Sequence, residues 1–294
     1  MAGREISVRD MIEQGTLRFT VGYKVQTIWG IAEALVFALE GVGATLVAVA
    51  VWQEQTVVLA AGIALMAAAV VLLVGHLGQP RNVWKAMRNL RQSWVSRGTL
   101  LIGGLIAMGL LQLVVGWTAL GSAAWVLKAA LFLDALAILA YPGFVLSSSP
   151  AIPFWNSGLM PVLSFVSGAA SGFAVWLAFA AVTGQQDLAQ YAQVLLVALG
   201  VVAACVFAYV AVQWRGPAAS GAAARRLLRR EAGLFLGLAC VVGLLVAALA
   251  AAPVAFGSPA VPAAWLIAAA LARVPGDLAL RQVFMRVGLY DPVL

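Results

Sequence analysis

The sequence predicts an all-α integral membrane protein, a bundle of eight transmembrane helices. Of its 294 residues 64% are hydrophobic and only 10% are charged, whereas a soluble domain carries roughly 25% charged residues. Several apolar runs reach the roughly 20 residues that a helix needs to cross a bilayer. They also lack the alternation of a β-barrel strand. The chain therefore has too few charged side chains to cover a surface that faces water.

Eight apolar runs follow an amphipathic arm at residues 1–24, which we expect to be exposed on the cytoplasmic side. A single membrane domain, residues 25–294, holds all of them. We expect the spans at residues 25–52, 56–75, 99–120, 123–146, 159–183, 191–214, 231–252 and from 262 onward. Pro275 and Gly276 should break or bend the last span, which then runs into a more polar tail.

Smaller features mark the ends and contacts of these spans. Trp29 and Trp52 flank the first span, where tryptophan anchors a helix at the membrane surface. An uncharged segment rich in turn-forming residues, 147–158, separates the fourth and fifth spans. The fifth span carries Gly168-x-x-x-Gly172, a spacing of small residues that is typical of closely packed membrane helices.

The basic residues are sorted to one side of this topology. Seventeen of the 18 Lys and Arg residues fall in the arm, two loops and the tail, whereas Lys128 alone falls on the other side. The tail contributes Arg273, Arg281 and Arg286. Basic loops stay in the cytoplasm, so we expect a multi-pass protein of a bacterial or archaeal inner membrane with both termini cytoplasmic. A basic face can also be selected to dock a partner. We expect contacts with the lipid bilayer and none with nucleic acid.

The loop after the second span collects the groups that can carry chemistry. Residues 74–99 contain the only histidine, His76, and five of the Lys and Arg residues. Imidazole titrates near neutral pH, although a histidine that only caps a helix is the alternative. The basic residues are most simply topology signals or a docking surface, and we place only Arg97 closer to a pocket. The docking candidates are Arg81, Lys85, Arg88, Arg91 and Trp94.

Ionisable residues inside the spans come in pairs seven residues apart, which puts each pair on one helix face. Glu33 and Glu40 form the pair of the first span, and Asp134 and Tyr141 form that of the fourth. Because these spans run in opposite directions, Glu33 and Tyr141 should lie with His76 in one layer. Glu40 and Asp134 should form a second layer, farther from the basic loop.

The first layer has the chemistry of a quinone pocket. A quinone head needs hydrogen-bond partners at its two oxygens and a group that exchanges protons as electrons move. Imidazole, a buried carboxyl and a tyrosine hydroxyl meet these needs. The expected quinone site is His76, Glu33, Tyr141, Arg97 and Trp29, with Glu40 and Asp134 as a proton path. The alternative is that these groups only pair with neighbouring helices and fix their register.

No redox metal is expected in this chain. Cys205 and Cys240 lie in separate apolar runs without ligand spacing, and we interpret them as small buried residues. A membrane b-type haem normally needs two axial ligands, usually histidines, and the chain has one histidine. Electrons would therefore pass directly between the quinone and a redox centre outside the chain.

Longer motifs resemble a known superfamily. The loop GHLGQPRNVWKAMRNLRQSWVSRG resembles the HLG-x-P…SWLSRE signature of dimethyl sulfoxide reductase anchors, and GDLALRQVFMRVGL resembles their closing segment. IWGIAEALVFALEGVGATL and AYPGFVLSSSPAIPFWNSGLMP resemble the polysulfide reductase membrane subunit. The resemblance to this NrfD/PsrC–DmsC superfamily implies an eight-helix, quinone-reactive membrane anchor of a molybdopterin oxidoreductase. It also implies two partners: a four-cluster iron–sulfur subunit and a molybdenum or tungsten bis-pterin catalytic subunit.

The resemblance also implies roles for single residues. His76 matches the anchor histidine that is linked to menaquinol oxidation, and Tyr141 matches a quinone-contacting tyrosine. Glu33 falls where the polysulfide-type subunit has a quinone-contacting asparagine. Gly98 departs from the dimethyl sulfoxide reductase anchors, which have a functional glutamate there, and Glu33 is our candidate for the missing carboxyl.

Charge sorting combined with the resemblance places the catalytic subunits in the cytoplasm. This favours a dehydrogenase complex that reduces menaquinone or ubiquinone in anaerobic respiration. The first alternative is a quinol-oxidising anchor of a dimethyl sulfoxide or polysulfide-type reductase. Alternatives of other classes are a scaffold without redox chemistry and a secondary transporter or ion channel, although the latter predicts inverted repeats, which we do not find.

Overall fold

The computed structural model describes residues 22–76, 89–118, 121, 124–257 and 262–291. Within them the structure confirms the predicted all-α membrane bundle, with eight helices long and apolar enough to span a bilayer. Seven of the spans are α-helical, and the remaining one begins as a π-helix, η3 (Gly233–Val246), that continues as α9 (Ala247–Ala255). The others are α2 (Ile31–Gln53), α3 (Thr56–His76), α4 (Trp94–Val115), α5 (Ala124–Ser147), α6 (Leu159–Val182), α7 (Leu188–Arg215) and α10 (Pro262–Arg286).

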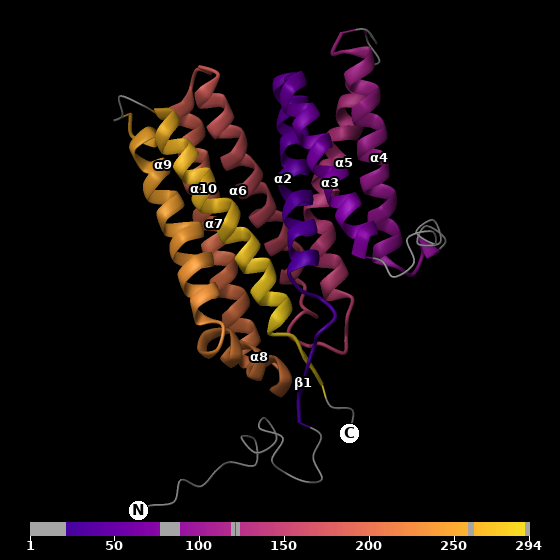
Figure 1. Cartoon of the computed structure of the whole chain (residues 1–294), viewed down its shortest axis with the longest axis vertical. Helices are drawn as coiled ribbons and strands as arrows, with labels where there is room; N and C mark the ends of the chain where they lie inside the picture. Colours follow the sequence, from indigo (N-terminus) through magenta and orange to yellow (C-terminus); the bar gives the residue numbers. More distant parts are fainter. Residues whose placement is uncertain (1–21, 77–88, 119–120, 122–123, 258–261, 292–294) are drawn as a thin grey trace, which may run out of the picture.

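The helices form two side-by-side groups, α2–α5 and α6–α10 (Figure 1). They meet where α2 and α5 pack on α6 and where α2 packs on α10. Helix α2 has most of its residues buried. It approaches α6 closely because small residues face each other. A Cβ atom on Gly168 would lie 3.1 Å from the Cα of Gly41, and one on Gly172 would lie 2.3 Å from the Cβ of Thr45. The predicted packing role of Gly168 and Gly172 is therefore confirmed.

A two-stranded sheet joins the two ends of the described chain. Strand β1 (Lys24–Val25) pairs antiparallel with β2 (Leu289–Tyr290). The side-chain amide of Gln26 donates to the backbone carbonyls of Trp29 and Met285, at 2.7 Å each. The first span consequently begins at Ile31 rather than at residue 25. We call this end of the bundle the strand end; Glu54 and Lys128, which form an ion pair, mark the far end.

The segment between spans six and seven is not only a basic loop, as the sequence suggested. It contains a short helix, α8 (Ala218–Arg229), at the strand end beside β1 (Figure 1). Its residues are mostly Ala, Arg and Leu, which have high helix propensity. The helix therefore carries arginines of this segment on an ordered surface.

The last span differs from its prediction in two respects: it has no break, and two arginines assigned to the tail lie inside it. Helix α10 is not broken at Pro275, and Gly276 serves as a packing site: a Cβ atom there would lie 2.2 Å from the Cα of Gly243 in η3. Contacts with α6 and η3 support the helix across the proline. Arg273 and Arg281 are not tail residues, because both lie inside α10 and are buried or nearly so. Asp277 holds both guanidinium groups within the bundle.

Candidate functional site

A cavity of about 210 Å³ lies among α2, α3, α4 and α5 toward the strand end. It collects four of the residues singled out from the sequence: Trp29, Glu33, Glu40 and Tyr141. Apolar side chains form the rest of its wall, namely Ile28, Val36, Phe37, Leu73, Val95 and Val145. The cavity is thus a mostly apolar space with two carboxyl groups and one phenol.

Glu33 is held at the start of α2. Its Oε2 atom accepts a hydrogen bond from the backbone N–H of Gly30 at 2.7 Å. A carboxylate in the first turn of a helix is stabilised there by the unpaired N–H groups and by the helix dipole. The side chain is half-buried and lines the cavity. Glu33 therefore has a structural role in addition to any chemical one.

Tyr141 comes from α5 and is 5% exposed. Its ring packs edge-to-face on Phe37, with ring centroids 6.3 Å apart and an interplanar angle of 82°. It faces Gly98 of the neighbouring helix α4, where a Cβ atom would lie 2.0 Å from Cε2 and Cζ of Tyr141. The absence of a side chain at Gly98 is what gives the tyrosine ring its place.

Glu40 is 1% exposed, and its Oε2 atom has no hydrogen-bond partner among the described residues. It lines the same cavity as Glu33 and Tyr141, so the predicted division into two layers does not hold for Glu40. Asp134 lies elsewhere on α5, with Oδ2 3.4 Å from the position of a Cβ atom on Gly104. Glu40 joins the first layer because helix α2 presents both Glu33 and Glu40 to the same cavity.

Arg97 lies outside this cavity. Its guanidinium stacks on the Trp94 ring at 4.4 Å from the centroid. It also donates to the backbone carbonyls of Leu90 (2.9 Å) and Arg91 (2.8 Å). Trp94 in turn stacks on Phe144 at 4.4 Å. Arg97 and Trp94 thus order the start of α4, and Arg91 is exposed beside them.

The remaining predicted residues fall largely outside the described part of the chain. His76 is the last residue of α3, three positions after Leu73 of the cavity wall, but its side chain lies outside what the structure describes. Arg81, Lys85 and Arg88 and the arm up to residue 21 also lie outside the described residues.

A buried ionic cluster next to the cavity was not predicted. Asp277 of α10 accepts from Arg281 Nε at 3.0 Å and from the hydroxyl of Ser167, and it lies 3.7 Å from Arg273. Arg273 also donates to the Ser167 carbonyl at 3.0 Å and to its hydroxyl at 2.7 Å. The i, i+4 spacing of Arg273, Asp277 and Arg281 is a signal that could have revealed the cluster.

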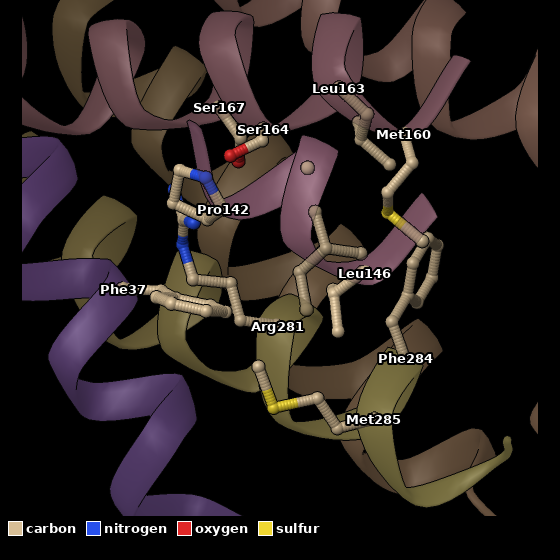
Figure 2. A pocket seen from close by; sticks show the side chains of 12 residues that line it. Phe37, Pro142, Leu146, Met160, Leu163, Ser164, Ser167, Arg281, Phe284 and Met285 are labelled. Atoms are coloured by element: carbon tan, nitrogen blue, oxygen red, sulfur yellow. The ribbon is translucent and has the colours of Figure 1, made fainter. Parts of the chain in front are cut away.

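Phe37 separates this cluster from the larger cavity. A second, small cavity of about 40 Å³ is lined by Phe37, Arg281, Ser164 and Ser167 among others. Figure 2 shows the Arg281 side chain reaching from α10 toward the two serines of α6. Its Nη2 atom is buried without a hydrogen-bond partner among the described residues. The small cavity is large enough for a water molecule, because a water needs roughly 10–15 Å³ of space for its centre.

Comparison with known families decides the classification. The family model described as polysulphide reductase, NrfD, matches residues 21–290. The chain belongs to this NrfD family. It is a family of membrane anchors of molybdopterin oxidoreductases, which normally associate with iron–sulfur and catalytic subunits. A search among curated proteins found no match.

NrfD membership confirms the superfamily that the motifs suggested. The match covers all eight spans together with both strands, β1 and β2. The cavity, the ionic cluster and α8 all lie within the matched range. The polar groups of the cavity and of the ionic cluster therefore belong to the part of the chain that matches the NrfD family.

Proposed function

We propose that this NrfD-family subunit exchanges electrons between a membrane quinone and an iron–sulfur subunit docked at the strand end. The observation that carries the proposal is the mostly apolar cavity in which Glu33, Glu40 and Tyr141 meet. Few convergent polar groups in an apolar pocket are typical of small-molecule sites. Ionisable groups inside a membrane bundle are also costly enough to favour a functional role.

The size of the cavity suits a quinone head rather than a whole quinone lipid. Its volume of about 210 Å³ is below the ~300–1,000 Å³ of pockets that enclose drug-sized ligands. Two residues of its wall, Ile28 and Val95, are 74% and 43% exposed. We infer that the isoprenoid tail leaves the cavity between them and lies in the bilayer.

The polar residues supply the hydrogen bonds and protons that quinone chemistry needs. The Tyr141 hydroxyl donates to one quinone oxygen. Glu33 and Glu40 hold or release protons near the head, and Glu40 has a carboxyl oxygen without a partner among the described groups. His76, which ends α3, adds a group that titrates near neutral pH. Asp134 extends the proton path beyond Glu40, and the apolar wall excludes bulk water.

The charges favour one docking face and, through it, one direction of electron flow. The strand end carries Lys24 of β1, Arg91 and Arg97 near the start of α4, and the arginines of α8. These basic residues favour a cytoplasmic location for that end. The partners would be a four-cluster iron–sulfur subunit and a molybdenum or tungsten bis-pterin catalytic subunit, both in the cytoplasm. We therefore favour a dehydrogenase complex that reduces menaquinone or ubiquinone. A reductase that oxidises quinol uses the same site in reverse.

Purification from the native host tests the proposal. The tagged chain, isolated in mild detergent, should carry stoichiometric iron–sulfur and molybdenum or tungsten subunits by mass spectrometry and metal analysis. Substrate-dependent reduction of added quinone would establish the direction. His76→Ala and Glu33→Gln should abolish quinone turnover and leave reduction of an artificial dye by the catalytic subunit intact. A chain that purifies alone without iron, or quinone turnover unchanged in both variants, would contradict the proposal.

A further inference from the structure

A polar cavity, separate from the quinone site, lies between α8 and the small sheet. Its volume is about 340 Å³, and three arginines of α8 together with Arg230, which directly follows the helix, form one wall. None of the described residues that line it is acidic. The described residues that line it are Tyr23, Val25, Ala222, Arg225, Arg226, Arg229, Arg230 and Leu289. The cavity is therefore a concentrated positive site at the strand end of the bundle.

The carboxylate that follows these arginines directly in the chain has another partner. Glu231, which follows the arginines directly, pairs with Arg286 at 3.4 Å. The Nε atom of Arg226 is buried without a hydrogen-bond partner among the described residues. Burial lowers the pKa of Arg226, and the charges of Arg230 and Arg286 lower it further, against the opposite effect of Glu231. A bound anion would reduce the repulsion between the arginines and accept a hydrogen bond from the Nε atom of Arg226.

An apolar groove of about 690 Å³ begins at the same short helix. It runs between α7 and η3, and its walls carry only apolar groups and the thiol of Cys240. On α7 the groove extends from Leu196 to Val210, about 21 Å at a rise of 1.5 Å per residue. Phe207 and Leu245 on its rim are 78% and 54% exposed. The groove therefore opens to the hydrocarbon of the membrane and has the length of a lipid chain.

Leu228 connects the two features. It lies at the foot of the groove and follows Arg225, which lines the basic cavity, by three residues. Residues three apart are neighbours on a helix surface. The basic cavity and the apolar groove therefore meet on adjacent faces of α8.

We propose that α8 and the groove form a binding site for an anionic phospholipid. Its phosphate headgroup binds the arginines, and one acyl chain lies between α7 and η3. Basic pockets between membrane helices on the cytoplasmic side suit such headgroups. An acidic peptide would use the arginines alone and leave the lipid-facing groove without an occupant, so the combination favours a lipid.

The headgroup is tested by native mass spectrometry of the delipidated full-length chain in detergent. Cardiolipin should bind more tightly than phosphatidylcholine of the same acyl chains. Arg226→Gln combined with Arg229→Gln should weaken cardiolipin binding roughly thirtyfold. Arg91→Gln is the control, because Arg91 is an exposed arginine of another loop, and it should bind as the unaltered chain does. Equal binding of both lipids, or an unaffected double variant, would overturn the proposal.

The acyl chain is tested at Gly200, which lines the groove. A Cβ atom there meets no other atom within 4 Å, and the same holds for Gly237, which does not line the groove. Gly200→Phe should therefore fold and weaken cardiolipin binding, whereas Gly237→Phe should not. Binding of water-soluble glycerophosphate should be the same in both. An unaffected Gly200→Phe variant, or inorganic phosphate binding as tightly as cardiolipin, would overturn the lipid in favour of a free anion or an acidic partner.

Discussion

The ring of Tyr141 occupies the space that a side chain at position 98 would need. A Cβ atom on Gly98 would lie 2.0 Å from two carbons of the ring and 2.5 Å from its hydroxyl oxygen. Gly98 stands where the resemblance to dimethyl sulfoxide reductase anchors implies a glutamate. The structure gives a steric reason for this departure: in this packing a longer residue at position 98 and the tyrosine ring exclude each other.

Gly98→Ala should therefore displace Tyr141 from the cavity. The added methyl group cannot be accommodated by a small shift, because the ring is buried against Phe37. We expect quinone turnover of the complex to fall by roughly an order of magnitude or more, because a misplaced reacting group slows the reaction. Dye reduction by the catalytic subunit should stay unchanged.

Gly103→Ala is the matched control, since it lies on the same helix and a Cβ atom there meets no other atom within 4 Å. Gly98→Ala combined with Tyr141→Ala separates the clash from other effects. The double variant should recover the thermal stability lost in Gly98→Ala but not the quinone turnover. Full quinone activity in Gly98→Ala alone would show that the ring does not need its observed position.

The sequence predicted the spans and part of the site because both depend on short-range patterns. Apolar runs give the eight helices, and a spacing of seven residues places Glu33 and Glu40 on one face of α2. The sequence did not predict that Glu40 shares a cavity with Tyr141. That contact depends on how α2 and α5 are rotated against each other, which no local pattern records.

Other features were missed for different physical reasons. A π-helix has i→i+5 hydrogen bonds and therefore a longer side-chain repeat than an α-helix. An all-apolar segment such as η3 has no polar face from which this longer repeat could be read. Arg273 and Arg281 were assigned to a basic tail, because charge alone does not distinguish an exposed arginine from one that is paired inside the bundle. Asp277, at i, i+4 from both, was the available indication.

Tyr141→Phe tests the hydroxyl without disturbing the ring. The edge-to-face packing on Phe37 should remain. Loss of one net hydrogen bond costs roughly 0.5–1.5 kcal/mol, so the apparent KM for quinone should rise about two- to twelvefold. Steady-state kinetics of the complex with a short-chain quinone would measure this. If the KM stays the same, the hydroxyl has no direct role in quinone binding.

Glu40→Gln tests the buried carboxyl as a proton carrier. Glutamine keeps the size and a carbonyl oxygen of Glu40 but cannot release a proton at neutral pH. We expect kcat for quinone to fall by about 10²-fold, the lower range for loss of general acid–base catalysis, with little change in KM. The kcat of the complex with quinone and with dye should be compared.

Glu54→Gln provides the comparison for this charge change. Glu54 pairs with Lys128 at the far end of the bundle and is half exposed, so its substitution should leave both activities unchanged. Equal kcat values in Glu40→Gln and the unaltered complex would place Glu40 outside the proton path.

Asp277→Asn should destabilise the bundle strongly. The Asp277 carboxylate, 1% exposed, is the acidic partner of two buried guanidinium groups, those of Arg273 and Arg281. Removing one partner of a buried ion pair costs roughly 3–5 kcal/mol because the remaining charge is left uncompensated. The temperature of half-inactivation in detergent should drop well below that of Asp187→Asn, which changes an exposed aspartate.

Adding Arg281→Gln to Asp277→Asn should restore part of the lost stability, since one uncompensated buried charge is removed with it. If Asp277→Asn has the same stability as Asp187→Asn, the cluster does not hold α10 in the bundle.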